Sequence, residues 1–375
     1  MTIINLEEFG IYYNGPIEEI IYIQRDAIPR AKYVNERVQE PYTHIEEITI
    51  QRLNEISTRR FYIGPILSKG TYGYVEYIET YETTIDASGN RHQNHHTIVR
   101  KRSKRQHHSL FLEACLQHIA YKALEAEGFS NAIAKVTDIY RLPGGSISFT
   151  MEALRNVEKV SDVLNRETNK DKLDILVISI LAQVAIFVQC LESNLCLNHR
   201  DMKGNNILIT KNAVEDKYIN TPKWKIFAEK RINIVDFGFA CIGLPPPPVM
   251  PAILSSDDFF NEDDGCPKKG RDLFQLISFF YIINNIRDTC SEKLVKIIEN
   301  CIDMKTSEID YCSYLRSQNP EKIDNIYDII AGSKFEAPSC EPHYLLQLLS
   351  DNYPEIVLLT QEILLKDNEI ISNNS

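Results

Sequence analysis

Residues 199–206 read HRDMKGNN and directly follow a long apolar stretch. Three side chains in this segment suit the transfer of a phosphoryl group. Asp201 can orient an attacking hydroxyl and accept its proton, and Lys203 can neutralise the charge of the moving group. The amide oxygen of Asn206 is a hard ligand of the kind that magnesium prefers. The segment therefore predicts a catalytic loop, and a polar turn between a helix and a strand is the plainer alternative.

A second acidic motif begins beyond this loop, where residues 232–238 read INIVDFG. An apolar strand that ends in Asp236 places a carboxylate at the strand end, and Gly238 then frees the backbone. Such a carboxylate can face a cleft and bind magnesium. DFG alone is a common turn, so its value comes from its position after the first loop.

Residues 67–75, LSKGTYGYV, place two glycines between two expected strands. Because Gly70 and Gly73 have no Cβ, this segment can fold closely over phosphates. A plain hairpin is the alternative interpretation. A P-loop is excluded, because no Gly-Lys-Ser/Thr sequence follows and the next expected element is a strand.

Residues 98–101, IVRK, form a fourth candidate motif. Strand alternation puts Val99 and Lys101 on the same face, so Val99 can touch a purine while Lys101 reaches phosphate. Glu113, on the helix expected next, is the best candidate for a partner of Lys101. A solvated basic strand end is the alternative.

Strand-rich residues early in the chain and helical spacing later predict an α+β fold with two unlike lobes and a ligand cleft between them. We expect strands at 61–67, 73–82, 96–101 and 146–154, a hairpin tip at 85–96, and a helix at 109–126. Later helices are expected at 171–194, 271–287, 291–303 and 343–365, with short strands at 206–210 and 232–237.

Composition narrows the class of protein. The net charge of −11 argues against general nucleic-acid binding, which needs a basic surface. The nine cysteines include no C-x-x-C pair, so we expect reduced, mostly buried thiols and no disulfide framework or zinc site. The apolar run 175–191 contains Ser179, Gln183 and Gln189, which favours a buried core helix over a membrane span. The N-terminus has no signal-peptide pattern.

These four motifs, in the order in which they follow one another along the chain, resemble those of the eukaryotic-type protein kinase family over roughly residues 61–290. The resemblance implies a bilobal fold, a small β-rich lobe with one main helix and a larger helical lobe, and it implies ATP and Mg²⁺ as cofactors. It assigns Asp201 as the base, Lys203 to the γ-phosphate, Asn206 and Asp236 to magnesium, and Lys101 to Glu113 and the α/β-phosphates. The remaining implied ATP contacts are Ser68, Gly70, Gly73, Val75, Val99, Met151, Glu152, Ala153, Leu154 and Leu208. Asp272 resembles the aspartate that braces the catalytic loop.

The same resemblance suggests the acceptor. Lys203 and a large residue at Phe239 are similar to kinases that modify serine and threonine, so protein substrates, including basic ones, are the expected partners. Two alternatives stay open, a pseudokinase that acts as a scaffold and a small-molecule kinase of the same fold. We expect no membrane or specific nucleic acid among the partners, and a cytoplasmic location. The Ile- and Asn-rich chain is similar in style to divergent kinases of large DNA viruses, which would place it in the host cytoplasm or the virion.

The chain departs from the family pattern at several positions. Ser68 replaces the first loop glycine, and Gln117 stands where an apolar residue is usual. Residues 210–230 read as an inserted hairpin, and no A-P-E sequence precedes Asp272. Four prolines at 245–248 favour an extended connector. Because of these departures, the sequence does not define the substrate-docking platform that the family pattern would imply.

Five acids lie between residues 257 and 264. We expect this acidic segment to hold Arg200 and so to replace a phosphorylated loop. The expected organisation is an N-terminal extension at 1–58, a first kinase lobe at 59–152 and a second at 153–375.

Overall fold

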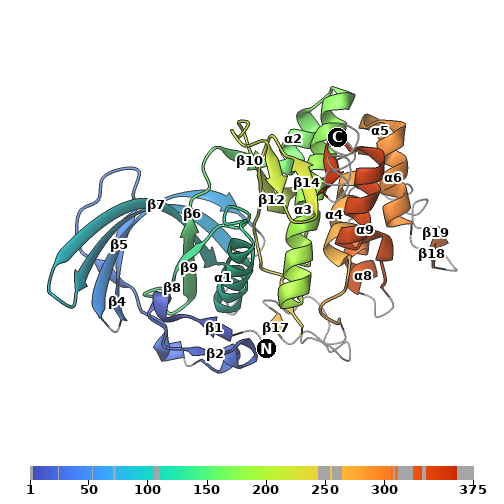
Figure 1. Ribbon diagram of the computed structural model, residues 1–375. Helices are drawn as coiled ribbons and strands as arrows, with labels where there is room; N and C mark the ends of the chain where they lie inside the picture. Colours follow the sequence, from blue (N-terminus) through green and yellow to red (C-terminus); the bar gives the residue numbers. More distant parts are fainter. Residues whose placement is uncertain are drawn as a thin grey trace, which may run out of the picture.

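A computed structural model shows a mixed α+β protein with a large antiparallel sheet beside a group of helices (Figure 1). It describes residues 3–23, 25–52, 54–70, 73–104, 110–243, 254–255, 264–284, 286–303, 305–306, 309–310, 324–331 and 335–360. The prolines at 245–248, four of the five acids at 257–264 and the residues after 360 lie outside these ranges.

The main sheet has seven strands in the order β3-β4-β5-β6-β7-β9-β8. The strand bounds are β3 (Lys32–Val34), β4 (His44–Arg52), β5 (Glu55–Lys69), β6 (Gly73–Asp86), β7 (Arg91–Ser103), β8 (Val136–Arg141) and β9 (Ile147–Glu152). Strands β6 and β7 are longer than expected, so the hairpin tip shrinks to residues 87–90. Residues 73–86 pair continuously with 91–103, because backbone N–H and C=O groups form the ladder whatever the polarity of the side chains.

The two ends of the sheet meet. Arg30, just before β3, bridges to Arg141 at the end of β8, and the amide of Ala31 donates to the Arg141 carbonyl at 2.7 Å. This pairing closes the sheet into a barrel. Its interior is filled by side chains that alternate inward along the strands, and the apolar ones are Ala31, Ile48, Ile50, Phe61, Ile63, Ile78, Ile98 and Tyr140.

The N-terminal segment packs on the main body, as expected for an ordered extension. It comprises β1 (Ile3–Asn5), η1 (Glu7–Phe9), β2 (Asn14–Pro16), η2 (Ile17–Tyr22) and η3 (Arg25–Ala27). The Phe9 ring lies edge-on to His118 of α1 (Leu110–Ala126). However, β4 is a full member of the barrel and β5 runs across residue 58. The extension is therefore structurally continuous with the sheet that follows it.

Helix α3 (Lys170–Leu195) is the core of the helical half. Asn169 caps its start by accepting from the Lys172 amide, and Cys196 ends it in the left-handed conformation. In the part of the chain that the structure describes, α3 is the one helix long and apolar enough to cross a membrane, and 72% of its most apolar window is buried inside the protein. The predicted buried core helix is therefore confirmed.

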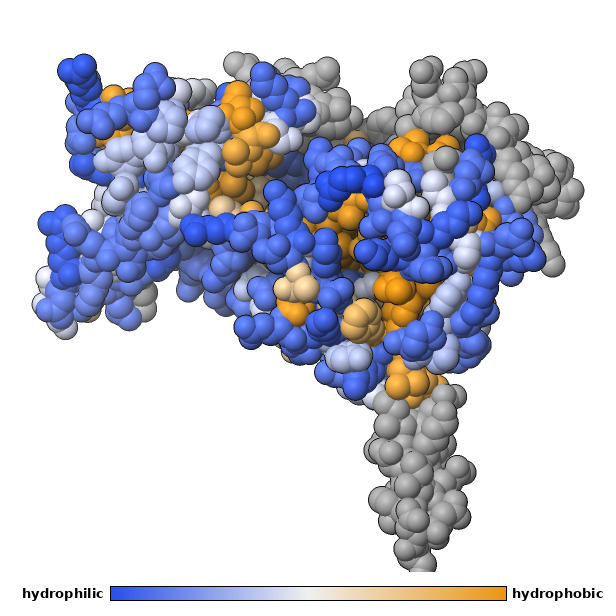
Figure 2. Space-filling view, turned by 90° about the horizontal axis from the view of Figure 1, so that it is seen from above, coloured by the Kyte–Doolittle hydropathy of each residue, from blue (hydrophilic) through white to orange (hydrophobic). Residues whose placement is uncertain are grey.

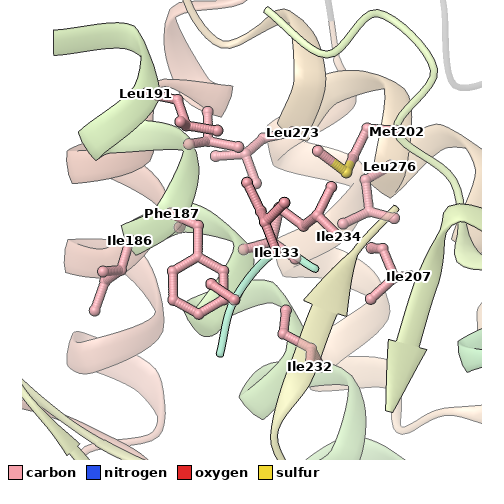
Figure 3. Packing of buried hydrophobic residues seen from close by; sticks show 14 of the residues in the cluster. Ile133, Ile186, Phe187, Leu191, Met202, Ile207, Ile232, Ile234, Leu273 and Leu276 are labelled. Atoms are coloured by element: carbon pink, nitrogen blue, oxygen red, sulfur yellow. The ribbon is translucent and has the colours of Figure 1, made fainter. Parts of the chain in front are cut away.

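Short strands and helices surround α3. In Figure 3, Phe187 and Leu191 of α3 lie near Ile232 and Ile234 of β15 and near Leu273 of α4. The bounds are α2 (Val160–Arg166), α4 (Arg271–Ile282), α5 (Ile286–Thr289), α6 (Glu292–Ile302), α8 (Asp324–Ala331), η5 (Pro338–Cys340) and α9 (Pro342–Asn352). The short strands are β10 (Val157–Lys159), β11 (Leu197–Asn198), β12 (Ile207–Thr210), β13 (Tyr218–Asn220), β14 (Trp224–Phe227), β15 (Ile232–Ile234), β16 (Cys241–Ile242), β17 (Leu254–Ser255), β18 (Lys305–Thr306), β19 (Ile309–Asp310) and β20 (Val357–Leu359).

Two helix predictions were wrong in extent. The expected helix at 271–287 is divided into α4 and α5. The expected helix at 343–365 ends at Asn352, and β20 follows as the third strand beside the hairpin β13–β14. The hairpin predicted within 210–230 is confirmed, and the pairing of β20 with β14 shows why the C-terminal residues leave the helix.

One cysteine prediction was also wrong. Cys241 and Cys266 form a disulfide across 25 residues of sequence, because β16 and the segment before α4 run side by side. Local sequence carries no signal for such a pairing. The other cysteines in the described ranges are free thiols, and four of them are buried: Cys115, Cys290, Cys301 and Cys340.

The face of the molecule drawn in Figure 2 is mainly hydrophilic where residues are coloured. On the face drawn in Figure 2, hydrophobic residues form small separate areas within a hydrophilic surround. This distribution agrees with the charged fraction of 25%.

Candidate active site

The segment 199–206 lies between α3 and β12, and side chains of α4 hold it in place by hydrogen bonds to its backbone. The carboxylate of Asp272 accepts hydrogen bonds from the amides of His199 and Arg200, at 2.8 and 2.9 Å. Gln275 accepts from the Met202 amide at 3.0 Å. Arg200 has a φ of +65°, a left-handed conformation that is costly for a side chain with a Cβ. The brace predicted for Asp272 is therefore confirmed, and it stabilises this strained turn.

Within the loop, Asp201, Lys203 and Asn206 form one hydrogen-bonded group. Lys203 Nζ lies 2.8 Å from Asp201 Oδ1, and Asn206 Nδ2 donates to Asp201 Oδ2 at 2.7 Å. Asp201 is only 4% exposed. Both of its carboxylate oxygens are thus oriented by neighbours, as a proton acceptor needs.

A second charged group forms where β7, α1 and the end of β15 meet. Lys101 Nζ lies 2.5 Å from Glu113 Oε1 and 2.6 Å from Asp236 Oδ1. The predicted partnership of Lys101 with Glu113 is confirmed. Asp236 has a φ of +69°, so the chain holds this residue in a second strained left-handed conformation. Strained positions of this kind gather at functional sites.

Burial and charge act in opposite directions on these groups. Burial disfavours ionisation of Asp236, but the Lys101 ammonium outweighs it and holds the pKa of Asp236 well below its usual range. Glu113 is completely enclosed, and that burial raises its pKa to about 7 despite the same lysine. The lowered pKa keeps the Asp236 carboxylate anionic. Because 48% of its side chain remains exposed, the carboxylate is also accessible to a ligand.

The glycine-containing segment forms the turn between β5 and β6. Ser68 pairs with Val75 across the hairpin, and the Gly70 amide donates to the Gly73 carbonyl at 3.0 Å. A Cβ on Gly73 would lie 2.7 Å from the Arg102 carbonyl oxygen, so this position admits only glycine without a backbone shift. The predicted strand–turn–strand arrangement is confirmed. This geometry agrees equally with a phosphate-binding loop and with a plain hairpin.

Four of the predicted nucleotide contacts share one face of the barrel. Val75 lies opposite Lys101, and Val99 lies opposite Met151. Directly opposed residues of an antiparallel pair point to the same side, and this side is opposite to the barrel interior. Leu208 comes from β12, where it pairs with Lys159.

The connection after β9 contains the other predicted adenine contacts. The Glu152 amide already donates to the Lys135 carbonyl at 2.9 Å, so that donor is engaged within the protein. Ala153 and Leu154 follow as half-buried residues outside any helix or strand. Gln117, where an apolar residue is usual, is buried and satisfied, because its amide donates to the Ala134 carbonyl at 2.8 Å.

Asn206 and Asp236 have the donor chemistry for magnesium. The Val235 amide donates to the Asn206 carbonyl at 3.0 Å, so the two segments run side by side. The NH₂ group of Asn206 donates hydrogen bonds to Asp201, and its amide oxygen, a hard ligand, can bind another partner. Among the residues that the structure describes, no group of three or more His, Cys, Asp or Glu could hold a metal. One carboxylate and one amide suit an ion whose other ligands are phosphate oxygens and water.

Arg200 meets the end of the acidic segment. Asp264, 1% exposed, accepts from Arg200 Nη2 at 2.9 Å. The same carboxylate binds Arg271 at 2.9 Å and Lys268 at 2.5 Å. The expected contact between the acidic segment and Arg200 is confirmed for Asp264, and the other four acids lie outside the described residues.

Sequence reasoning missed Tyr327. This residue of α8 donates from its hydroxyl to Asp201 Oδ1 at 2.5 Å. It lies more than a hundred residues from the loop in sequence and outside every motif, so no local pattern could have located it.

The chain matches no protein-family model, and no curated protein matches it. The geometry of the described residues is therefore the basis for a functional argument.

Proposed function

We propose that this protein is an ATP- and Mg²⁺-dependent phosphotransferase that acts on serine or threonine hydroxyls of proteins. One observation carries the proposal. Lys101 is held between Glu113 and Asp236 at 2.5 and 2.6 Å, on the sheet face that also presents Val75 and Val99. A buried ammonium fixed in this way, beside a partly exposed carboxylate, is suited to bind a polyphosphate and its metal.

The residues divide the reaction between them. Lys101 orients the α- and β-phosphates of ATP, and Asp201 accepts the proton of the acceptor hydroxyl. Lys203 neutralises charge on the γ-phosphoryl group as it moves. Asn206 and Asp236 would hold magnesium, which would supply Lewis-acid stabilisation of the phosphate oxygens. Asp272 keeps the loop in position through its bonds to the His199 and Arg200 amides.

The fold supports the same proposal. The barrel with α1 would be the small lobe and the elements around α3 the large lobe of a bilobal kinase. The boundary at 152/153 lies at the end of β9, where the chain passes from the sheet to the helical half. A nucleotide between Val99 above and Leu208 below would bridge the two halves at this connection.

A transfer assay tests the proposal. The protein is incubated with labelled ATP, Mg²⁺ and a generic basic protein, beside a panel of small alcohols and sugars. Asp201→Asn and Asp236→Asn should each lower transfer, by roughly 10²–10⁴-fold for the base. Asp288→Asn is the matched control, because the Asp288 side chain is 61% exposed and pairs with its neighbour Arg287.

The three outcomes separate the alternatives. Transfer to the protein acceptor that Asp201→Asn abolishes supports the proposal. Transfer to a metabolite alone would instead identify a small-molecule kinase. Absence of transfer from a protein that still binds ATP would identify a pseudokinase.

A further inference from the structure

Helix α8 brings a phenol to the catalytic loop. Two of its residues anchor it, since Ile326 is 2% exposed and Ile330 is fully buried. The Tyr327 ring lies edge-on to Phe279 of α4, with centroids 5.9 Å apart. The helix is therefore packed on α4 through apolar contacts, and these contacts aim Tyr327 at Asp201.

The Tyr327 hydroxyl makes two polar contacts there. It donates to Asp201 Oδ1 at 2.5 Å, and Lys203 Nζ donates to it at 3.2 Å. An attacking hydroxyl needs the same two partners, a carboxylate to take its proton and a cation beside the incoming phosphoryl group. The phenol therefore stands in the place of the acceptor hydroxyl.

We propose that Tyr327 is an internal phosphoryl acceptor, the first hydroxyl that the enzyme modifies. This inference rests on the proposed function, and it extends the acceptor class from serine and threonine to a phenol. The Tyr327 Oη–H proton passes to Asp201, and the oxygen forms a new bond to the γ-phosphorus of ATP. The bond from that phosphorus to the β,γ-bridging oxygen breaks, and ADP leaves with the electron pair.

Phosphorylation would then clear the site. A phosphotyrosine carries a charge of about −1.5 to −2 at neutral pH. Placed beside the buried Asp201 carboxylate, this charge is repelled, so the α8 tyrosine leaves the acceptor position. Before modification Tyr327 competes with a protein substrate for Asp201, and afterwards the site is open.

The test follows phosphate on the intact protein. Wild-type protein, purified without phosphate, is mixed with ATP and Mg²⁺ at several enzyme concentrations, and the modified residues are mapped by mass spectrometry. We expect phosphate on Tyr327, formed with a rate constant that does not change with enzyme concentration. Transfer to an added basic protein should begin after a lag of the same duration.

Two variants sharpen the test. Tyr327→Phe keeps the ring against Phe279 but removes the hydroxyl, so the lag and the Tyr327 phosphate should both be lost while transfer to the added protein persists. Tyr344→Phe is the matched control, because Tyr344 is a 55% exposed tyrosine of α9. It should behave as wild type.

The failures are distinguishable. Transfer to the added protein without phosphate on Tyr327 would overturn this inference and leave the proposed function standing. A rate constant that rises with enzyme concentration would overturn the intramolecular step. Absence of transfer to any acceptor would overturn both proposals.

Discussion

Arg100 and Lys101 follow one another in β7, yet their side chains enter two different regions of the molecule. Arg100 points into the barrel, where it binds Glu76 at 2.6 Å and Glu46 at 2.7 Å. Its Nη1 also donates to the Tyr140 hydroxyl at 3.3 Å. Arg100, Glu46 and Glu76 are all nearly inaccessible, so this group is closed to ligands.

Lys101 points the other way and also has two carboxylate partners. The difference lies in access, because the Asp236 side chain keeps 48% of its surface exposed. A cation between two sealed carboxylates fixes the packing of strands. A cation between one sealed and one open carboxylate can additionally bind something that arrives from solvent. Charge alone does not distinguish the closed group around Arg100 from the candidate site around Lys101, and the exposure of Asp236 does.

The largest effect on stability is expected inside the barrel. Arg100→Met should lower the free energy of unfolding by about 4 kcal/mol, because buried Glu46 and Glu76 would lose the guanidinium that they share and keep only His44 and Arg102 as partners. Denaturant titration measures this loss, and transfer activity per folded molecule should stay near wild type. A loss below about 1 kcal/mol would contradict the closed structural role.

Lys101→Met should instead lower transfer activity strongly and stability only slightly. Phosphoryl transfer is expected to fall by roughly 10²–10³-fold, because a charged contact to the phosphates disappears. The unfolding midpoint should change much less than in Arg100→Met, since Glu113, whose pKa is already raised to about 7 by burial, can take up a proton. Unchanged transfer would remove Lys101 from the site.

Asp264→Asn tests a third charged group, in which one carboxylate serves Arg200, Arg271 and Lys268. We expect a loss of about 3 kcal/mol in unfolding free energy, the lower end for a broken buried pair, because the amide keeps some hydrogen bonds. Transfer should fall as well, since Arg200 precedes Asp201, the base of the proposed reaction.

The acidic segment gives a functional control for this group. Full activity of the protein without phosphate on residues 244–263 would support the idea that Asp264 replaces a loop phosphate. Unchanged activity after all five acids at 257–264 become amides would exclude it.

The smallest effect concerns a carboxylate that forms no ion pair with the residues that the structure describes. Burial raises the pKa of Glu192, at the end of α3, to about 8, and the nearby Asp272 charge adds to this. In the barrel, His44 and Arg100 outweigh burial and lower the pKa of Glu46 instead. Because the folded pKa of Glu192 is raised, its contribution to stability is complete below about pH 4.5 and is lost as the pH rises through about 8.

Glu192→Gln removes this titration. The variant should unfold like wild type at low pH and be more stable by about 2 kcal/mol above pH 8, less than the full shift implies because the helix end can relax and admit water. Denaturant titrations at a series of pH values measure the difference. A difference between the variant and wild type that does not change between about pH 4.5 and 8 would show that Glu192 does not titrate in this range.

Several features were predictable from the sequence because they depend on neighbours in the chain. The HRDMKGNN segment placed Asp201, Lys203 and Asn206 together, since a turn of eight residues brings its own side chains within reach. Alternation placed Val99 and Lys101 on one strand face. The 26-residue α3 was predicted almost to its ends from its apolar run and its polar flanks.

Other features were not predictable, because they depend on where distant elements meet. Closure of the barrel rests on Arg30 reaching Arg141, and β20 leaves the expected helix to pair with β14. The Cys241–Cys266 disulfide joins two segments that share no motif. In each case the local pattern is compatible with other placements, and packing selects one.

The sequence by itself therefore determined which side chains make up the candidate site: the proposed base, two cations and two proposed oxygen ligands in a fixed order along the chain. Only the tertiary structure decided how these groups are held and which distant side chains contact them. In the folded chain, Arg100 points into the barrel and Lys101 points away from it. Asp264 pairs with Arg200, and Tyr327 reaches Asp201 from a helix more than a hundred residues away. The physical reason is that hydrogen bonds and ion pairs act over a few ångströms in space, and local periodicity specifies only the faces of each element.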